Sequence, residues 1–425
     1  MATQVIQSVY ALVAALTEHQ ILEPVQQTEL TRALQTRFTD ARSLAKELIQ
    51  RGWLTPYQIN QLFQGKGADL VLGQYILLER LGEGGMGQVF KARHVHMGRV
   101  VALKVIRKEH LDQPDAVRRF RREIQAAAQL FHPNVVMAYD ASQVDNTHFF
   151  VMEYVEGIDL ATLLKRLGPP PVGLACEYIR QAALGLQHAF ERGMVHRDIK
   201  PHNLLVTCPP ETKTWPVQGA VVKILDMGLA RVDLMDGPES VSALTKEGRV
   251  VGTPDYMAPE QAVNPHKTDI RADLYSMGCT FFQLLTNQVP FPKGTTMEKL
   301  LKHRLDPIPT VEKFRPEVPA GVSRIVSKLL AKKPEERYQT PGDLAAALQP
   351  WSGAGVFAPV AQIVSDTSET PLEAELATLS SSSLRHLASP APPGESFWSW
   401  PVIIGGIVTM VIMLLFLIGI VLTMG

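Results

Sequence analysis

The residues with the clearest capacity for chemistry lie in one short stretch, residues 195–203, which reads VHRDIKPHN. It places a carboxylate, an ammonium group and an amide within six positions, at Asp198, Lys200 and Asn203. A second acidic side chain, Asp226, follows in the turn DMG. Transfer of a phosphoryl group needs such a set, because cations and bound Mg²⁺ must stabilise its spread negative charge while a carboxylate orients the attacking hydroxyl. The stretch therefore predicts phosphoryl transfer.

With these residues in place, the sequence resembles the protein kinases, whose catalytic loop reads H-R-D-x-x-x-x-N and whose metal-binding turn reads D-F-G. The resemblance implies that Asp198 orients the substrate hydroxyl and that Lys200 stabilises the γ-phosphate of ATP. It also implies that Asn203 and Asp226 hold Mg²⁺. The turn departs from the family pattern at Met227, where the family has phenylalanine. Because methionine is apolar and flexible, we expect this change to affect the inactive geometry more than the chemistry.

Two further motifs precede the catalytic loop. Residues 82–89 fit G-x-G-x-x-G-x-V between strand-like segments, and glycines there let the backbone close over phosphates. Lys104 ends the strand-like run VVALK, and its buried charge would need a partner, for which Glu123 is the candidate. A hinge between two lobes is expected within residues 148–157. The resemblance implies that ATP is bound by Leu81, Gly82, Glu83, Gly84, Gly85, Met86, Gly87, Gln88, Val89, Ala102, Lys104, Glu123, Glu153 and Val155.

Motifs that follow the catalytic loop extend the resemblance. The run GTPDYMAPE at residues 252–260 is similar to the family's G-T-x-x-Y-M-A-P-E, in which Thr253 would face the substrate hydroxyl. This run and the Asp-x-Lys form of the catalytic loop are typical of Ser/Thr-specific kinases. By the same resemblance, Glu260 is expected to be buried against Arg337, and Asp273 to anchor the backbone of the catalytic loop.

The polar stretch at residues 227–252 fits an activation segment. It contains Ser240, Ser242 and Thr245, and Arg197 is the residue that in the family pairs with a phosphate in this segment. Arginine clamps the roughly two negative charges of a phosphate well. We therefore hypothesise that one of the three residues is autophosphorylated and that this raises activity. An unmodified, solvated loop is the alternative.

Residues 1–66 are expected to form a small helical module. The pair Thr39-Asp40 can cap one helix, and Thr55-Pro56 reads as a cap and first-turn proline for the next. No basic region precedes an apolar run at the start, so we do not expect a signal peptide. Two interpretations stay open, a module that binds another protein and a packing extension of the following domain.

The C-terminal stretch changes composition twice. Residues 351–397 are rich in Ser, Ala, Pro and Thr, which predicts a disordered linker. Residues 401–424 carry no charge, and about 24 such residues can cross the ~30 Å hydrocarbon core of a bilayer. Phe397, Trp398 and Trp400 stand at the near edge, where aromatic residues gather in membrane proteins. We therefore expect one transmembrane helix.

Composition excludes some classes of function. Lys plus Arg and Asp plus Glu number 42 each, and this balance argues against nucleic acid as a partner. The three cysteines are scattered singly, so neither a disulfide framework nor a cysteine metal site is expected.

The sequence thus predicts an α+β protein with the two-lobed protein kinase fold at residues 75–350, and the resemblance is greatest to bacterial eukaryotic-like (Hanks-type) Ser/Thr kinases. The expected cofactors are ATP and Mg²⁺, and the expected partners are proteins phosphorylated on Ser or Thr and a membrane. A second copy of the chain is retained as a candidate partner. The kinase domain would lie in the cytoplasm, tethered by one membrane pass, and residues 208–219 would form a surface hairpin. A nucleotide-binding pseudokinase scaffold and a membrane-anchored adaptor acting through residues 1–66 are the alternatives.

Overall fold

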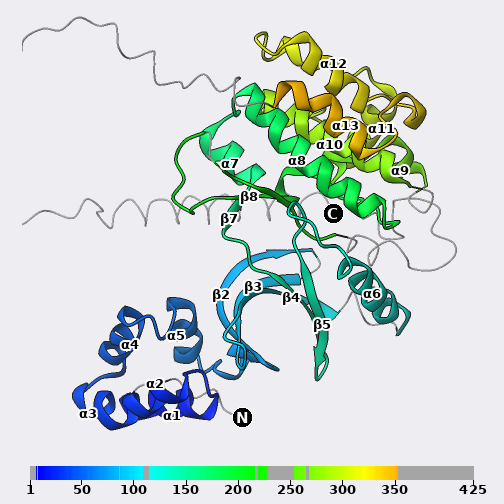
Figure 1. Cartoon of the computed structure of the whole chain (residues 1–425). Helices are drawn as coiled ribbons and strands as arrows, with labels where there is room; N and C mark the ends of the chain where they lie inside the picture. The colour runs from blue at the N-terminus through cyan, green and yellow to red at the C-terminus, as the bar shows by residue number, and fades with distance from the viewer. Residues whose placement is uncertain are drawn as a thin grey trace, which may run out of the picture. The chain divides into compact units, whose positions relative to one another are not determined.

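The chain forms a helical module, a β-rich lobe and a helical lobe, in that order along the sequence (Figure 1). The predicted α+β architecture with two lobes is confirmed. The structure is a computed structural model, and it describes residues 6, 8–85, 87–108, 114–215, 219–227, 253–264 and 268–352. Almost all of the predicted linker and all of the predicted membrane segment lie outside these residues. Within the described ranges, no helix has the length and apolar character needed to cross a membrane.

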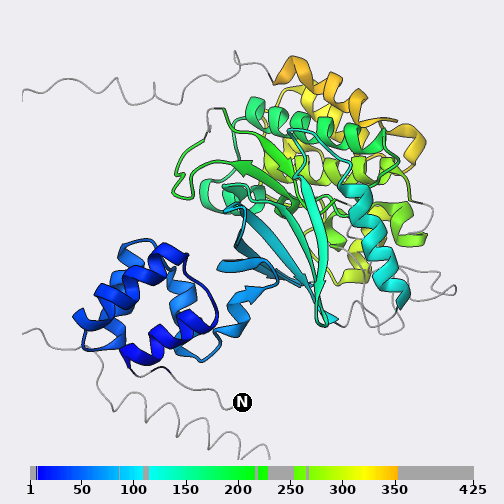
Figure 2. The same ribbon diagram turned by 60° about the horizontal axis from the view of Figure 1, so that its bottom comes forward.

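The N-terminal module is a bundle of short helices, and Figure 2 shows them gathered around a shared centre. Two helix starts occur where the sequence predicts them. Asp40 accepts a hydrogen bond from Ser43 N at 2.9 Å, and Thr55 caps the next helix in a reciprocal pair with Gln58. Fully buried leucines fill the bundle. The elements are α1 (Val9–Glu18), α2 (Pro24–Glu29), a π-helical turn (Leu30–Leu34), α3 (Gln35–Arg37), α4 (Ala41–Gln50) and α5 (Pro56–Phe63).

The β-rich lobe is an antiparallel sheet with the strand order β1-β2-β3-β4-β6-β5. Its strands are rich in β-branched and aromatic residues. Successive side chains along a strand point to opposite faces of the sheet, and each face packs into a hydrophobic core. The β2–β3 hairpin closes where Gly84 pairs with Gly87. The elements are β1 (Val71–Leu72), β2 (Tyr75–Gly84), β3 (Gly87–His94), β4 (Val100–Ile106), α6 (Pro114–Ala127), β5 (Ala138–Val144) and β6 (Thr147–Glu153).

The helical lobe surrounds α10, most of whose residues are buried. α10 (Ile270–Thr286) lies against α8 (Val172–Phe190) and α12 (Ala320–Leu329), and α13 (Pro341–Leu348) lies against α8 (Figure 1). A three-stranded sheet, ordered β7-β8-β9, adjoins these helices. The remaining elements are β7 (Gly157–Asp159), α7 (Leu160–Leu167), β8 (Leu204–Thr207), β9 (Val222–Ile224), α9 (Pro259–Val263) and α11 (Thr296–Leu305).

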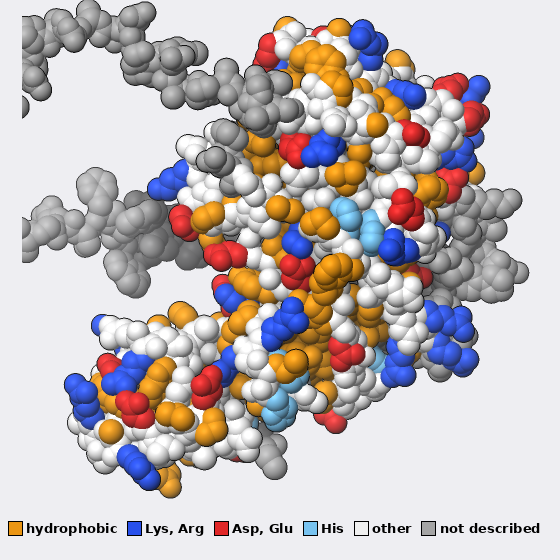
Figure 3. All heavy atoms as spheres, viewed as in Figure 1, with side chains coloured by type: hydrophobic (Ala, Val, Ile, Leu, Met, Phe, Trp, Pro, Cys, Tyr) orange, Lys and Arg blue, Asp and Glu red, His pale blue; other side chains and the backbone are white. Residues whose placement is uncertain are grey.

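The predicted surface hairpin at residues 208–219 joins β8 to β9, which pair antiparallel. Its described part packs against the helical lobe, since Trp215 Nε1 donates a hydrogen bond to Gly168 O at 3.1 Å. Over most of the face seen in Figure 3, acidic and basic side chains are interspersed, and basic side chains gather at its lower right edge. This agrees with the formal net charge of zero.

Candidate active site

The catalytic loop brings together the three groups that the sequence predicts. Lys200 Nζ lies 2.7 Å from Asp198 Oδ2 and 3.0 Å from Thr253 Oγ1. Asn203 Nδ2 donates to Asp198 O at 2.8 Å and lies 3.2 Å from its Oδ2. The side chains of Asp198 and Lys200 are 25% and 20% exposed, so a substrate can reach them. A carboxylate and an ammonium group thus meet beside a hydroxyl, as phosphoryl transfer requires.

A buried carboxylate fixes the backbone of this loop. Asp273 on α10 is fully buried, and it accepts hydrogen bonds from the backbone N–H groups of His196 at 2.7 Å and Arg197 at 2.6 Å. Arg197 has a left-handed backbone with φ 70°, a conformation that needs such support. Burial raises the pKa of Asp273 above its ordinary value, while the hydrogen bonds from the backbone N–H groups of His196 and Arg197 oppose the rise. The predicted anchor is confirmed.

Two residues to which the sequence assigned no role complete the support. The ring of His196 is buried, and its Nε2–H donates to Leu225 O at 2.8 Å, so that its Nδ1 accepts from Asp198 N at 3.2 Å. Gln261 Nε2 donates to Arg197 O at 2.8 Å. His196 stands in the H-R-D motif itself, whereas nothing in the sequence marks Gln261.

Lys104 forms an ion pair with Asp226. Lys104 is buried on β4, and its Nζ lies 2.8 Å from Asp226 Oδ2. Burial raises the pKa of Asp226, but the charge and hydrogen bond of Lys104, together with the nearby Lys200 ammonium group, lower it, and the net result is a pKa below the ordinary value. Glu123, the expected partner of Lys104, is half-buried on α6 and has an interaction of its own. Among the described residues, the ion-pair partner of Lys104 is therefore Asp226, the carboxylate predicted to hold metal. The pairing of Lys104 with Glu123 stays a prediction.

Packing explains only one of the glycines in the nucleotide-binding motif. A Cβ added at Gly82, Gly84 or Gly85 would meet nothing within 4 Å, whereas a Cβ at Gly87 would lie 1.8 Å from Val105 O. Gly87 is thus required by the close approach of β3 to β4. The other three glycines are not required by their described protein neighbours, and the open space beside them would let a ligand approach the backbone.

The other predicted ATP-site residues lie around this hairpin and the strand end of β6. Ala102 is buried, Val89 and Gln88 are half-buried, and Leu81 is exposed. Glu83 forms an ion pair with Arg107, with 2.7 Å between Oε1 and Nη2. Met86 lies outside the described residues.

The hinge follows β6. Glu153 N donates to Met137 O at 2.9 Å, and Glu153 Oε2 lies 3.0 Å from Lys223 Nζ on β9. Val155 is half-buried in the connector that runs to β7. A side chain of the hinge is therefore tied to the strand that leads to Asp226.

Asn203 and Asp226 fit a hard divalent cation. Because Asn203 Nδ2 donates to Asp198, the amide oxygen is the atom of Asn203 with capacity to bind a cation. Carboxylate and amide oxygens are the ligands that Mg²⁺ accepts, usually together with substrate phosphates. Within the described ranges, no group of three or more His, Cys, Asp and Glu side chains could hold a metal ion by itself. The donor set therefore fits a cation that is bound together with a phosphate.

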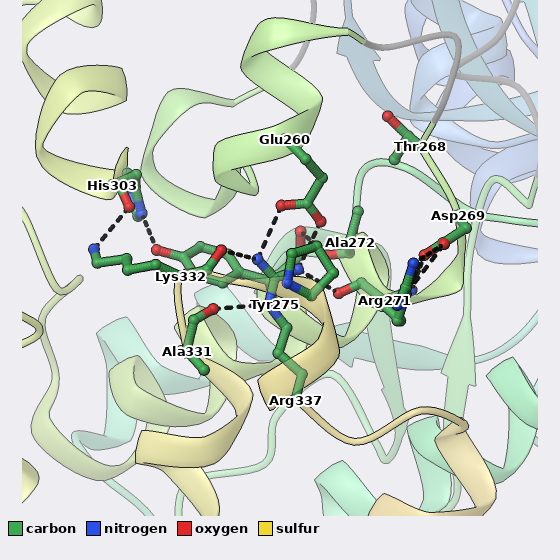
Figure 4. A network of polar contacts seen from close by, with 12 residues as sticks. Glu260, Thr268, Asp269, Arg271, Ala272, Tyr275, His303, Ala331, Lys332 and Arg337 are labelled. Atoms are coloured by element: carbon green, nitrogen blue, oxygen red, sulfur yellow. Dashed lines mark hydrogen bonds and ion pairs between the residues drawn. The ribbon is translucent and has the colours of Figure 1, made fainter. Parts of the chain in front are cut away.

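Behind the site, Arg337 joins several segments of the helical lobe (Figure 4). Its guanidinium makes two parallel bonds to Glu260, at 2.6 Å and 2.9 Å, and it also donates to Arg271 O and Ala331 O. The Arg337 side chain is fully buried. The predicted pair of Glu260 and Arg337 is confirmed, although Glu260, expected to be buried, is 27% exposed and Arg337 is the buried member. The pair holds the segment after Thr253 against the lobe.

A buried histidine lies in the same region. Tyr275 Oη and His303 Nδ1 are 2.8 Å apart (Figure 4). Burial, aided by the nearby Lys332 ammonium group, lowers the pKa of His303 to about 4.

Some predicted features fall outside the described residues. Residues 228–252 are among them, so the activation segment and the sites Ser240, Ser242 and Thr245 stay predictions. Met227 is described, and it is buried in the main hydrophobic core, as expected for an apolar replacement of phenylalanine.

Comparison with known proteins gives one family. The family model described as protein kinase domain matches residues 75–349. Serine/threonine-protein kinase PrkC of Bacillus subtilis is 34% identical over 66% of this chain and 40% of its own length. Serine/threonine-protein kinase PknB of Mycobacterium leprae is 35% identical, over 65% and 42%. Serine/threonine-protein kinase pkn3 of Myxococcus xanthus is 37% identical, over 63% and 48%. The chain thus spans less than half the length of these relatives.

Solved structures give the same result. The PknI kinase domain of Mycobacterium tuberculosis superimposes with a TM-score of 0.51 at 25% identity, covering 66% of this chain and 97% of that domain.

Proposed function

Because this chain belongs to the protein kinase family, we propose that it transfers the γ-phosphate of ATP to serine and threonine hydroxyls of proteins. The observation that carries the proposal is the cluster in which Lys200 Nζ contacts both Asp198 Oδ2 and Thr253 Oγ1. A hydroxyl beside Thr253 would meet a carboxylate that accepts its proton and an ammonium group that stabilises the phosphoryl charge. Thr253 and the Asp-x-Lys loop favour Ser and Thr over Tyr as acceptors.

Each residue of the cluster has one task in this reaction. Asp198 orients the acceptor hydroxyl and takes its proton, a role for which the hydrogen bond from Asn203 to its carbonyl fixes the backbone. Lys200 stabilises the γ-phosphate. Asn203 and Asp226 would hold Mg²⁺, which when bound neutralises charge on the phosphates. Lys104 supplies a further cation for the phosphates from β4.

We propose that the nucleotide is bound by the predicted ATP-site residues. The glycines that packing does not require would close over the phosphates, and Ala102 and Val89 would cover the base. The backbone of Glu153 and Val155 would hydrogen-bond the adenine. The positions of these residues in the hairpin, β4 and the hinge support this assignment.

The membrane tether is a separate part of the proposal. The uncharged stretch at residues 401–424 would anchor the protein by a single pass, with the kinase domain in the cytoplasm, where ATP is available. Fractionation of cells tests it. We expect the full chain to resist extraction by carbonate and to dissolve in detergent, and a chain ending at residue 397 to be extracted by carbonate. Equal behaviour of the two chains would exclude the tether.

The kinase proposal is tested with ATP labelled at the γ-phosphate. We expect the full chain to label itself or a generic acceptor protein, with all label on phosphoserine and phosphothreonine after acid hydrolysis. The Asp198→Asn variant, which keeps the size of the side chain but loses its charge, should give no label. Label on phosphotyrosine, or nucleotide binding without transfer, would contradict the proposal, and the second result would favour a pseudokinase scaffold.

A further inference from the structure

Helix α5 of the N-terminal module is bonded to strand β2 by two side chains. Gln58 Nε2 donates to Leu77 O at 2.9 Å, and Thr55 Oγ1 donates to Leu78 O. Gln58 is 2% exposed, and its Oε1 accepts a hydrogen bond from Thr55 N at 2.9 Å. The polar groups that cap α5 therefore also satisfy two carbonyls of the kinase domain.

The two carbonyls belong to an irregularity in β2. Leu77 faces Ala92 on β3 and Glu79 faces Lys91, so Leu78 is an extra residue without a partner in the register. Such a bulge bends and twists its strand, and it interrupts the regular ladder of hydrogen bonds. Thr55 and Gln58 stabilise the bulge, because their side chains donate hydrogen bonds from outside the sheet to its carbonyls.

Apolar contacts secure the same junction. Ile76 belongs to the hydrophobic core of the module, and Leu78 packs against that core. Tyr57 on α5 lies with its ring centre 6.2 Å from that of Phe90 on β3. An ion pair between Arg93 of β3 and Glu23 also connects the β-rich lobe to the module. The module is therefore a packing extension of the β-rich lobe.

The bulge lies a few residues before the glycines of the nucleotide loop. A second register shift follows between Arg80 and Gly82, and the hairpin then closes at Gly84 and Gly87. At the tip, a Cβ at Gly82 or Gly84 would meet nothing, and the ion pairs of Glu83 with Arg80 and Arg107 lie between side chains that are at least 40% exposed, so no buried contact of these residues restrains the tip. Its direction is set by the twist of the strands at its base.

We propose that the N-terminal module positions the glycine-rich loop, with Thr55 and Gln58 as positioning residues that raise the affinity for nucleotide. This inference rests on the proposed function, because it assumes that the loop binds the phosphates of ATP. Loss of either donor would leave a carbonyl of the bulge without its partner. The hairpin would then sample more directions, and nucleotide binding would have to restrict them again.

The test uses the full chain and three measurements. These are the Kd for a fluorescent ATP analogue, the separate KM values for ATP and for a protein acceptor, and backbone hydrogen exchange in residues 76–91. In Gln58→Leu we expect Kd and the KM for ATP to rise about two- to tenfold, the range that loss of one intramolecular hydrogen bond supports. The KM for the acceptor should not change. Gln64→Leu is the matched control, because Gln64 is exposed at the end of the same helix, and it should behave as the wild type.

A second pair of variants covers the case in which Gln58→Leu fails to fold. Thr55→Val removes the hydroxyl donor at almost constant size, and Thr55→Ser keeps the donor. We expect the valine variant to bind nucleotide more weakly with faster exchange in residues 76–91, and the serine variant to restore both. Unchanged Kd and unchanged exchange in folded Thr55→Val would overturn the proposal. Absence of phosphate transfer by the wild type would instead contradict the kinase function, and the comparison of Kd values would still decide the role of the module.

Discussion

In the helical lobe, a fully buried carboxylate fixes the backbone of the catalytic loop, whereas in the β-rich lobe the tip of the glycine-rich loop is restrained by ion pairs of Glu83 that are exposed to solvent. Asp273 accepts two backbone N–H groups of the catalytic loop, and the ring of His196 bonds to the loop and to Leu225. The tip of the glycine-rich loop offers open space at Gly82 and Gly84. The two loops are thus restrained to different degrees.

The proposed function gives a reason for this difference. Groups that take part in proton transfer must be held close to their productive geometry, which buried hydrogen bonds to rigid helices achieve. A loop that closes over a nucleotide must let it enter and leave, and such loops are drawn from the less stable parts of a structure. The following changes test the comparison, from the largest expected effect to the smallest.

The largest effect is expected at Asp226, where the pair with Lys104 joins the two lobes. Asp226→Asn removes the charge that we propose binds the metal, so phosphate transfer should fall on the order of 10³-fold, as for other electrostatic groups of active sites. The rate of transfer at saturating ATP is the measurement. Asp140→Asn, an exposed aspartate on β5, is the control and should leave the rate unchanged. Equal rates for the two variants would remove Asp226 from the proposed site.

The next effect concerns the buried support of the helical lobe. Arg337→Leu leaves Glu260 without its bidentate partner, and breaking a buried ion pair from one side costs about 3–5 kcal/mol of unfolding free energy. Lys333→Leu is the comparison, because its pair with Glu336 is exposed at 69% and 55%. Such surface pairs contribute about 0–1 kcal/mol. Denaturant unfolding measures both, and a similar loss in the two variants would show that burial of the pair does not matter.

Acid should destabilise the helical lobe through His303. Its pKa is lowered from 6.5 to about 4, so between these values the unfolded chain binds the proton more readily than the folded one. The stabilising contribution is complete above pH 6.5 and is lost as the pH falls toward 4. It amounts to about 3 kcal/mol, from 1.36 kcal/mol for each pKa unit.

His303→Gln, which still accepts a hydrogen bond but does not titrate, isolates this contribution. We expect the unfolding free energy of the wild type to fall more steeply than that of the variant between pH 7 and pH 4. Parallel pH profiles would mean that His303 is not buried in its neutral form.

The smallest effects are expected when one glycine in each of the two regions is replaced by alanine. A Cβ at Gly278 on α10 would lie 2.7 Å from Leu329 Cβ, so Gly278→Ala should cost about 1–3 kcal/mol of unfolding free energy by overpacking. Gly84→Ala enters open space and should stay within about 0.5 kcal/mol. It should still weaken binding of the ATP analogue. Thermal unfolding and binding measured on both variants check this, and a large stability loss in Gly84→Ala would show that the loop is packed.

Sequence reasoning succeeded where the chemistry is coded locally. Asp198, Lys200 and Asn203 stand within one loop, so their proximity follows from the sequence, while their tasks in catalysis stay predictions. The pairs Asp273 with the loop backbone and Glu260 with Arg337 were also predicted, because each member belongs to a motif of the family.

The contacts of the N-terminal module with the backbone of β2 could not be predicted from the sequence. The start of α5 at Thr55 and Pro56 was predicted, but the acceptors of Thr55 and Gln58 are carbonyls of β2, and every residue has a carbonyl.

Lys104 was expected to pair with Glu123, and its contact with Asp226 was not foreseen because both acids are plausible partners for one buried cation. Propensity and motif spacing do not decide between two such partners.

The most direct test of the kinase assignment measures ATP binding and γ-phosphate transfer on the same samples of the full chain, as wild type and as Asp198→Asn. We predict that both bind the fluorescent ATP analogue with similar Kd, and that only the wild type transfers phosphate to serine or threonine. Equal transfer by the two proteins, or binding without transfer by the wild type, would contradict the assignment of Asp198 as the residue that takes the hydroxyl proton.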